Sequence, residues 1–132
     1  MADAKTPAER PLSPHLQIYK PSLTMVMSIV HRITGAALYV GTLLLALYLI
    51  GVASGKDGYA IAAAVYGSWF GKLVLFGYTW ALLHHMMGGI RHLIWDTGAG
   101  LEDPARENIV KATLIASVAL TIIVWVIVGT MK

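Results

Sequence analysis

Three polar side chains lie on one face of a helix that is otherwise apolar. Ser28, His31 and Arg32 stand at positions i, i+3 and i+4, and Gly35 continues this face one turn further on. A hydroxyl, an imidazole and a guanidinium together can hydrogen-bond a carbonyl oxygen or pair with a carboxylate. Arg32 alone could simply extend its charged end to the lipid headgroups. The clustering of three polar groups favours a binding site over that explanation.

A second polar group runs from His84 to His92. His85 and His92 are seven residues apart, so they stack about 20° apart on one helical face, whereas His84 points roughly 100° away from His85. Gly88 and Gly89 leave the face beside His85 free of side chains. A histidine beside a flat glycine surface suits an iron ligand with space for a porphyrin, but the same glycines could serve helix packing. The residues alone leave both interpretations open, and they favour a packing or hydrogen-bonding role for His84.

A haem with two histidine ligands would need a second imidazole. The last apolar stretch of the chain contains no His, and His31 would serve only if it faced His85 at the same depth. We therefore expect the second ligand to come from another polypeptide, which makes this chain a subunit. Arg91 and His92, together with Arg32 or His31, could pair with the haem propionates.

The elements that must position these groups are membrane spans. Of the 132 residues, 57% are hydrophobic and only 13% are charged, whereas a soluble domain carries about a quarter charged residues. Ten Lys and Arg residues, spread along the chain, form no basic stripe for nucleic acid. The absence of Cys excludes a disulfide framework, an iron–sulfur site and a Cys-ligated zinc within this chain. The composition predicts a single-domain, all-α membrane protein.

Three uncharged stretches are long enough to cross a bilayer, which takes about twenty helical residues. They cover residues 33–55, 73–90 and 112–131. With their flanking signals, the predicted transmembrane helices span about 22–53, 68–95 and 104–131, after an N-terminal segment at 1–21.

Local signals define the ends of these helices. Ser22 or Thr24 is the expected cap of the first helix, and Pro104 is the expected first residue of the third. A glycine-rich stretch around Lys56 and Asp57 predicts a turn between the first two.

Lys and Arg are distributed unequally between the two sides of the predicted bundle. Seven fall on the side of the N-terminus and the link between the second and third helices: Lys5, Arg10, Lys20, Arg32, Arg91, Arg106 and Lys111. Lys56, Lys72 and Lys132 fall on the other side. The positive-inside rule then predicts a cytoplasmic N-terminus and a periplasmic C-terminus. The first residues lack a signal-peptide core and an Arg-rich transit pattern, so we expect the bacterial inner membrane rather than the mitochondrial one.

Both polar groups resemble signatures of the succinate dehydrogenase cytochrome b subunit, the large membrane anchor of respiratory complex II. The first signature reads Arg10-Pro11-Leu12-Ser13-Pro14-His15-Leu16, followed by Ser28-x-x-His31-Arg32-x-Thr34. The second reads His85-x-x-x-Gly89-Ile90-Arg91-His92-Leu93-x-Trp95-Asp96. The resemblance covers nearly the whole chain, and three spans in this orientation agree with it.

The resemblance implies that the three transmembrane helices form half of a heterodimeric haem-binding helical bundle. A second, smaller anchor subunit supplies the other half, and haem b lies between them with His85 as the ligand from this chain. His31, Arg32 and His92 match positions near the haem propionates. Ser28 and Arg32 match residues that line the ubiquinone site, and Leu16 and Ile29 are looser candidates for its apolar wall.

The resemblance also implies two soluble partners, a flavoprotein subunit that oxidises succinate and an iron–sulfur subunit that passes electrons to ubiquinone. This chain then has no catalytic residue for succinate oxidation and acts as a non-flavin membrane subunit. We expect it to contact membrane lipid and to bind no nucleic acid.

Two other classes of function stay open. A self-contained b-type cytochrome could form a homodimer in which each chain gives one His85. A small helical membrane scaffold or transporter fragment could use its histidines for packing alone. Within the family, the Ser-x-x-His-Arg pattern favours ubiquinone reduction over fumarate reduction.

Overall fold

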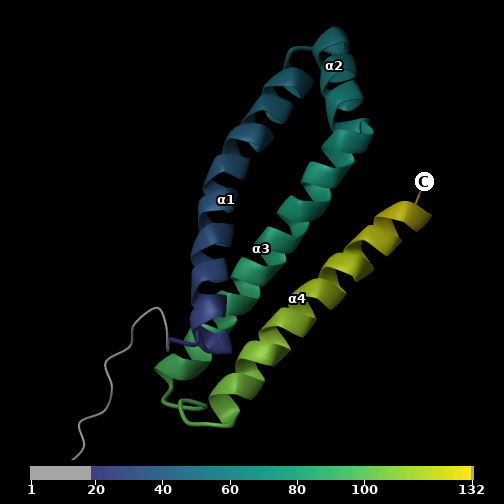
Figure 1. Cartoon of the computed structure of the whole chain (residues 1–132). Helices are drawn as coiled ribbons and strands as arrows, with labels where there is room; N and C mark the ends of the chain where they lie inside the picture. The colour runs from purple at the N-terminus through teal and green to yellow at the C-terminus, as the bar shows by residue number, and fades with distance from the viewer. Residues whose placement is uncertain (1–18, 132) are drawn as a thin grey trace, which may run out of the picture.

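The computed structural model describes residues 19–131 and consists of four α-helices (Figure 1). They are α1 (Leu23–Ala53), α2 (Lys56–Gly67), α3 (Trp69–Asp96) and α4 (Ala105–Thr130), and the described range contains no strand. With 31, 28 and 26 residues, α1, α3 and α4 are long and apolar enough to cross a membrane. The predicted all-α membrane fold with three spans is confirmed.

Each long helix is antiparallel to the long helix before it, and α3 lies between α1 and α4 (Figure 1). The start of α1, the end of α3 and the start of α4 lie at one end of the bundle, which we call the motif end. α2 and the C-terminus lie towards the opposite end, which we call the α2 end. Both polar groups of the sequence therefore fall in the half of the bundle nearer the motif end.

Side-chain caps define the starts of two long helices. Ser22 caps α1 by accepting a hydrogen bond from the Met25 N–H (3.4 Å), and Ser68 caps α3 by accepting one from the Gly71 N–H (3.0 Å). Pro104 was expected to be the first helical residue of α4, but it is the cap before Ala105. Its carbonyl accepts the Asn108 N–H at 3.1 Å, so α4 begins one residue later than predicted.

The helix α2 was not predicted. The glycines around Lys56 and Asp57 indicated a turn, but only Gly55 among them has a positive φ, at 89°, and this residue suffices to reverse the chain. The Ala-rich sequence that follows has high helix propensity. The connection from α1 to α3 is therefore a short helix rather than a loop.

The glycines of this connection instead allow α2 to fold back against α1. A Cβ atom at Gly58 would lie 2.7 Å from the Cβ of Ser54, and one at Gly51 would lie 3.0 Å from the Cβ of Ala62. Near the other end of α2, the Tyr66 hydroxyl donates a hydrogen bond to the carbonyl oxygen of Leu44 (2.5 Å). These contacts hold α2 against α1.

The packing is unlike that of a soluble protein. The most completely buried side chains are His84, Val110, Ser117 and Thr121, whereas most large apolar side chains of the spans face outward. Small and hydroxylated residues at helix contacts, with aliphatic residues outside, are typical of helices packed in lipid. The outward apolar faces are therefore surfaces for lipid or for other membrane subunits.

Candidate functional site

Three histidines converge between α1 and α3 near the motif end. The rings of His31 and His85 stack face to face, with centroids 4.0 Å apart and planes tilted by 2°. The ring of His92 lies 5.4 Å from that of His31 at an angle of 59°. The fold thus brings together side chains from both polar groups of the sequence.

Two glycines make this convergence possible. A Cβ atom at Gly35 of α1 would lie 2.8 Å from Cε1 of His85, and one at Gly88 of α3 would overlap the ring of His31. Each imidazole therefore occupies the space left by a glycine on the opposite helix. The sequence left Gly88 open to a porphyrin or to helix packing, and the structure shows close packing, because Gly88 makes room for the His31 ring of α1.

The environment of His85 suits an iron ligand. Its Nδ1 is 3.1 Å from the backbone carbonyl oxygen of His31, and its Nε2 has no hydrogen bond to any described residue. Histidine ligands of metals commonly donate one ring N–H to a carbonyl, which leaves the other nitrogen free for the metal. The side chain is half-buried, and a Cβ atom at Gly89 would meet nothing within 4 Å. A flat group could therefore approach His85 over Gly89.

None of the other three histidines in residues 19–131 is placed to share an iron with His85. The face-to-face stack of His31 directs no ring nitrogen at an atom between the two rings. His84 is fully buried against α4, and His92 is two helical turns further along α3. A second histidine ligand to an iron bound by His85 would therefore come from outside residues 19–131.

His84 and Arg91 belong to a buried stripe of α3. The Nδ1 of His84 is 3.2 Å from the Ser117 hydroxyl of α4, and the His84 ring stacks on Trp80 with centroids 5.2 Å apart. The inferred hydrogen-bonding role of His84 agrees with this geometry. Sequence reasoning missed its partner, although buried Thr113, Ser117 and Thr121 recur every four residues along α4.

Arg91 is buried without a counterion from the described part of the chain. Only 3% of its surface is exposed, its Cζ lies 5.1 Å from the centroid of the Trp95 ring, and its Nε and Nη1 have no hydrogen-bond partner there. The two ion pairs in the same part of the chain are Arg106–Asp103 and Lys111–Glu107. Because an unpaired buried charge is costly, Arg91 is suited to an anionic group supplied by a ligand or another subunit.

Ser28, Arg32 and Ile29 occupy the surface of α1 next to the histidines. Ser28 is half-buried, whereas Arg32 and Ile29 are exposed. The structure therefore keeps Ser28 and Arg32 on adjacent turns, while His31 turns towards α3. Leu16, the other candidate for the apolar wall, lies outside the described residues.

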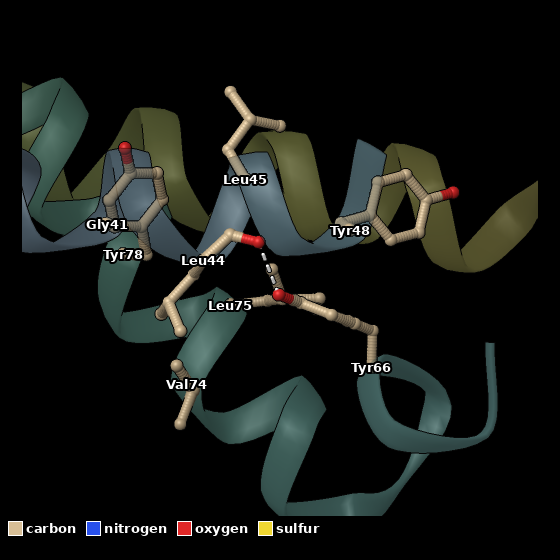
Figure 2. A pocket seen from close by; sticks show the side chains of 8 residues that line it. All are labelled: Gly41, Leu44, Leu45, Tyr48, Tyr66, Val74, Leu75 and Tyr78. Carbon is tan, nitrogen blue, oxygen red and sulfur yellow. Dashed lines mark hydrogen bonds between the residues drawn. The ribbon is translucent and has the colours of Figure 1, made fainter. Parts of the chain in front are cut away.

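A separate cavity of about 400 Å³ lies between α1, α2 and α3, towards the α2 end. Figure 2 shows Leu44, Tyr48 and Tyr78 around it, with the Tyr66 hydroxyl bonded to the Leu44 carbonyl oxygen. Its lining is almost wholly apolar and includes no His, Arg, Lys or carboxylate. The imidazole and guanidinium groups that could bind a metal or an anion are instead found in the histidine cluster and its neighbours.

Comparison with known proteins gives the family of this chain. The model of the family described as succinate dehydrogenase/fumarate reductase transmembrane subunit matches residues 6–128. The succinate dehydrogenase cytochrome b556 subunit of Paracoccus denitrificans is 39% identical over 127 residues, which cover 96% of this chain and 97% of that protein. The protein of the same name from Rickettsia prowazekii is 38% identical over 118 residues, 89% of this chain and 92% of that protein.

A mitochondrial relative shows the same similarity. The succinate dehydrogenase cytochrome b560 subunit of Sus scrofa is 37% identical over 119 residues, which cover 86% of this chain and 70% of that protein. The family match spans both polar groups, α1, α2, α3 and all but the last two residues of α4. This chain belongs to the succinate dehydrogenase/fumarate reductase transmembrane subunits and is a cytochrome b membrane subunit of that oxidoreductase complex.

Proposed function

We propose that this chain binds haem b together with a second, smaller anchor subunit and contributes to the site where ubiquinone is reduced. The observation that carries the proposal is the geometry of His85. One ring nitrogen is bound to the backbone of α1, the other is free, and the surface over Gly89 is open. The partner anchor supplies the second axial histidine.

The haem would be held by residues of α1 and α3. His85 Nε2 is the iron ligand, and Arg91, Arg32, His31 and His92 offer positive or hydrogen-bonding groups to the propionates. The buried guanidinium of Arg91, without a counterion in residues 19–131, supports this assignment because it needs an anion. Bound haem supplies a centre that accepts and returns one electron at a time.

Ubiquinone would bind at the motif end, beside Ser28 and Arg32, with Ile29 and Leu16 as apolar wall. The Ser28 hydroxyl can hydrogen-bond a quinone carbonyl oxygen, and the fixed charge of Arg32 stabilises negative charge that develops on that oxygen during reduction. Because Arg32 lies in the first turns of α1, near the motif end, protons can reach the site from water at the membrane boundary. The apolar tail of the quinone can enter from the lipid.

The soluble partners would dock at the motif end. A flavoprotein subunit oxidises succinate, and an iron–sulfur subunit delivers the electrons to the quinone beside Ser28. The motif end is then the cytoplasmic end in a bacterial inner membrane. In this role the chain anchors the enzyme and shapes the quinone site, without a catalytic group for succinate.

Isolation of the intact assembly tests the proposal. The chain, tagged at its C-terminus, is extracted gently from its native membrane, and the co-purifying polypeptides and haem are identified by mass spectrometry and absorption. We expect a flavoprotein, an iron–sulfur protein, a second small anchor and one haem b per assembly. A haem-bearing preparation of this chain alone would contradict the proposal and indicate the homodimeric cytochrome. A preparation without haem would indicate a scaffold.

A further inference from the structure

The backbone carbonyl of His31 contacts the side chain that is proposed to ligate the iron. This oxygen lies 3.1 Å from Nδ1 of His85 and also accepts a hydrogen bond from the Thr34 hydroxyl at 2.9 Å. The Thr34 hydroxyl lies 3.0 Å from the Val30 carbonyl oxygen as well, so its one proton is shared between two acceptors. His85 and Thr34 thus share one acceptor oxygen, and each bond to it weakens the oxygen as an acceptor for the other.

Gly35 makes the approach of His85 possible. A Cβ atom at this position would lie 2.8 Å from Cε1 and 3.3 Å from Nδ1 of the imidazole. Both atoms belong to the ring of a half-buried side chain that is stacked on His31, so they cannot simply rotate away. Any residue larger than glycine would move the ring away from the carbonyl oxygen that its Nδ1 contacts.

We propose that Gly35 and Thr34 are positioning residues that set the electron-donating strength of His85 through the His31 carbonyl. The inference rests on the proposed haem ligation by His85. A ligand imidazole that donates its Nδ1–H to a carbonyl becomes more basic at Nε2. A more basic axial ligand stabilises ferric over ferrous iron and lowers the reduction potential of the haem. Gly35 allows this hydrogen bond, and Thr34 limits its strength.

Two substitutions should shift the potential in opposite directions. Gly35→Ala pushes the imidazole from the carbonyl, so the midpoint potential of the haem rises. Thr34→Val keeps the side-chain shape but removes the competing donor, so His85 binds the carbonyl more strongly and the potential falls. Gly77→Ala is the matched control, because a Cβ atom there meets nothing within 4 Å and the potential should stay unchanged.

The experiment uses the whole complex. Redox titration of the haem absorption gives the midpoint potential, and low-temperature electron paramagnetic resonance of the oxidised haem gives the strength of the axial ligands. Shifts of the same sign in both variants would indicate general loosening and overturn the inference, as would unchanged potentials with haem retained. If Gly35→Ala does not assemble, the sign of the Thr34→Val shift decides alone.

Replacement of the ligand separates this inference from the proposed function. If His85→Gln abolishes haem binding while the Gly35 and Thr34 variants keep the native potential, only the positioning role is wrong. If His85→Gln retains the native haem spectrum, the proposed ligation itself is wrong.

Discussion

Two adjacent histidines of α3 have different surroundings. His84 is fully buried and hydrogen-bonded to Ser117 of α4, whereas His85 is half-buried against α1 with Nε2 free. Their separation follows from the 100° that one helical residue turns. The sequence could separate the two side chains by this angle, but it could not give the partner of His84, since the angle does not specify which helix lies on which side.

The same substitution at these two positions should therefore have different effects. His85→Gln removes the proposed iron ligand, and we expect loss of nearly all haem from the purified complex. His84→Gln should keep the haem but lower the stability of the chain by about 1–3 kcal/mol, because it disturbs a buried hydrogen-bonding group. Haem absorption per complex measures the loss of haem, and the thermal midpoint of aggregation measures the loss of stability. Equal haem loss in both variants would contradict the assignment.

The proposed quinone residues call for a different measurement. Ser28→Ala would remove the proposed hydrogen bond to the quinone, of about 0.5–1.5 kcal/mol, which corresponds to a roughly 2- to 10-fold loss in kcat/KM for ubiquinone. Arg32→Gln removes a charge-assisted bond of about 1.5–3 kcal/mol and should cost roughly 10- to 150-fold.

Both variants should retain succinate oxidation with an artificial dye that takes electrons from the soluble subunits. Ile33→Val is the matched control on α1, because Ile33 is 62% exposed and outside the proposed site. Equal losses with the dye and with ubiquinone would indicate a general defect and exclude a specific quinone role.

At the scale of elements, the sequence predicts the spans better than their crossings. The bilayer dictates the length of an apolar helix, so α1, α3 and α4 could be located from uncharged stretches. The contacts of Gly35 with His85 and of Gly88 with His31 depend on the crossing of α1 and α3, which periodicity within one helix does not determine. α2 was missed for a related reason: its helix signal is short, and its glycines serve close contact with α1 rather than a loop.

A tight contact between α1 and α3 carries a prediction of its own. Gly41 faces the ring of Tyr78, which a Cβ atom at position 41 would overlap. Gly41→Leu should therefore separate the two helices and lower the thermal midpoint of the purified complex by several degrees, as overpacking typically costs about 1–3 kcal/mol. Gly129→Leu on α4, where a Cβ atom meets nothing within 4 Å, should leave the midpoint unchanged. An unaltered midpoint in Gly41→Leu would show that this contact is not maintained in the complex.

At the scale of the whole molecule, most of the Lys and Arg residues lie at the motif end, together with the histidine cluster. In the described range this end carries Lys20, Arg32, Arg91, Arg106 and Lys111, whereas the α2 end carries only Lys56 and Lys72. The positive-inside rule then predicts that the histidine cluster and the proposed quinone site lie next to the cytoplasm. Under the proposed function, this is the side where the soluble subunits would deliver electrons and where protons for quinone reduction would be taken up.

The absence of Cys from the sequence makes this orientation directly measurable. Ser54, between α1 and α2, and Thr97, after α3, are both exposed and lie at opposite ends of the bundle. In intact cells with a permeable outer membrane, a membrane-impermeant maleimide should label Ser54→Cys and spare Thr97→Cys. Thr97→Cys should react once the inner membrane is opened, and labelling in denaturant gives the total for each variant. The reverse pattern would place the histidine cluster at the periplasmic side, where soluble subunits in the cytoplasm could not reach the quinone beside Ser28.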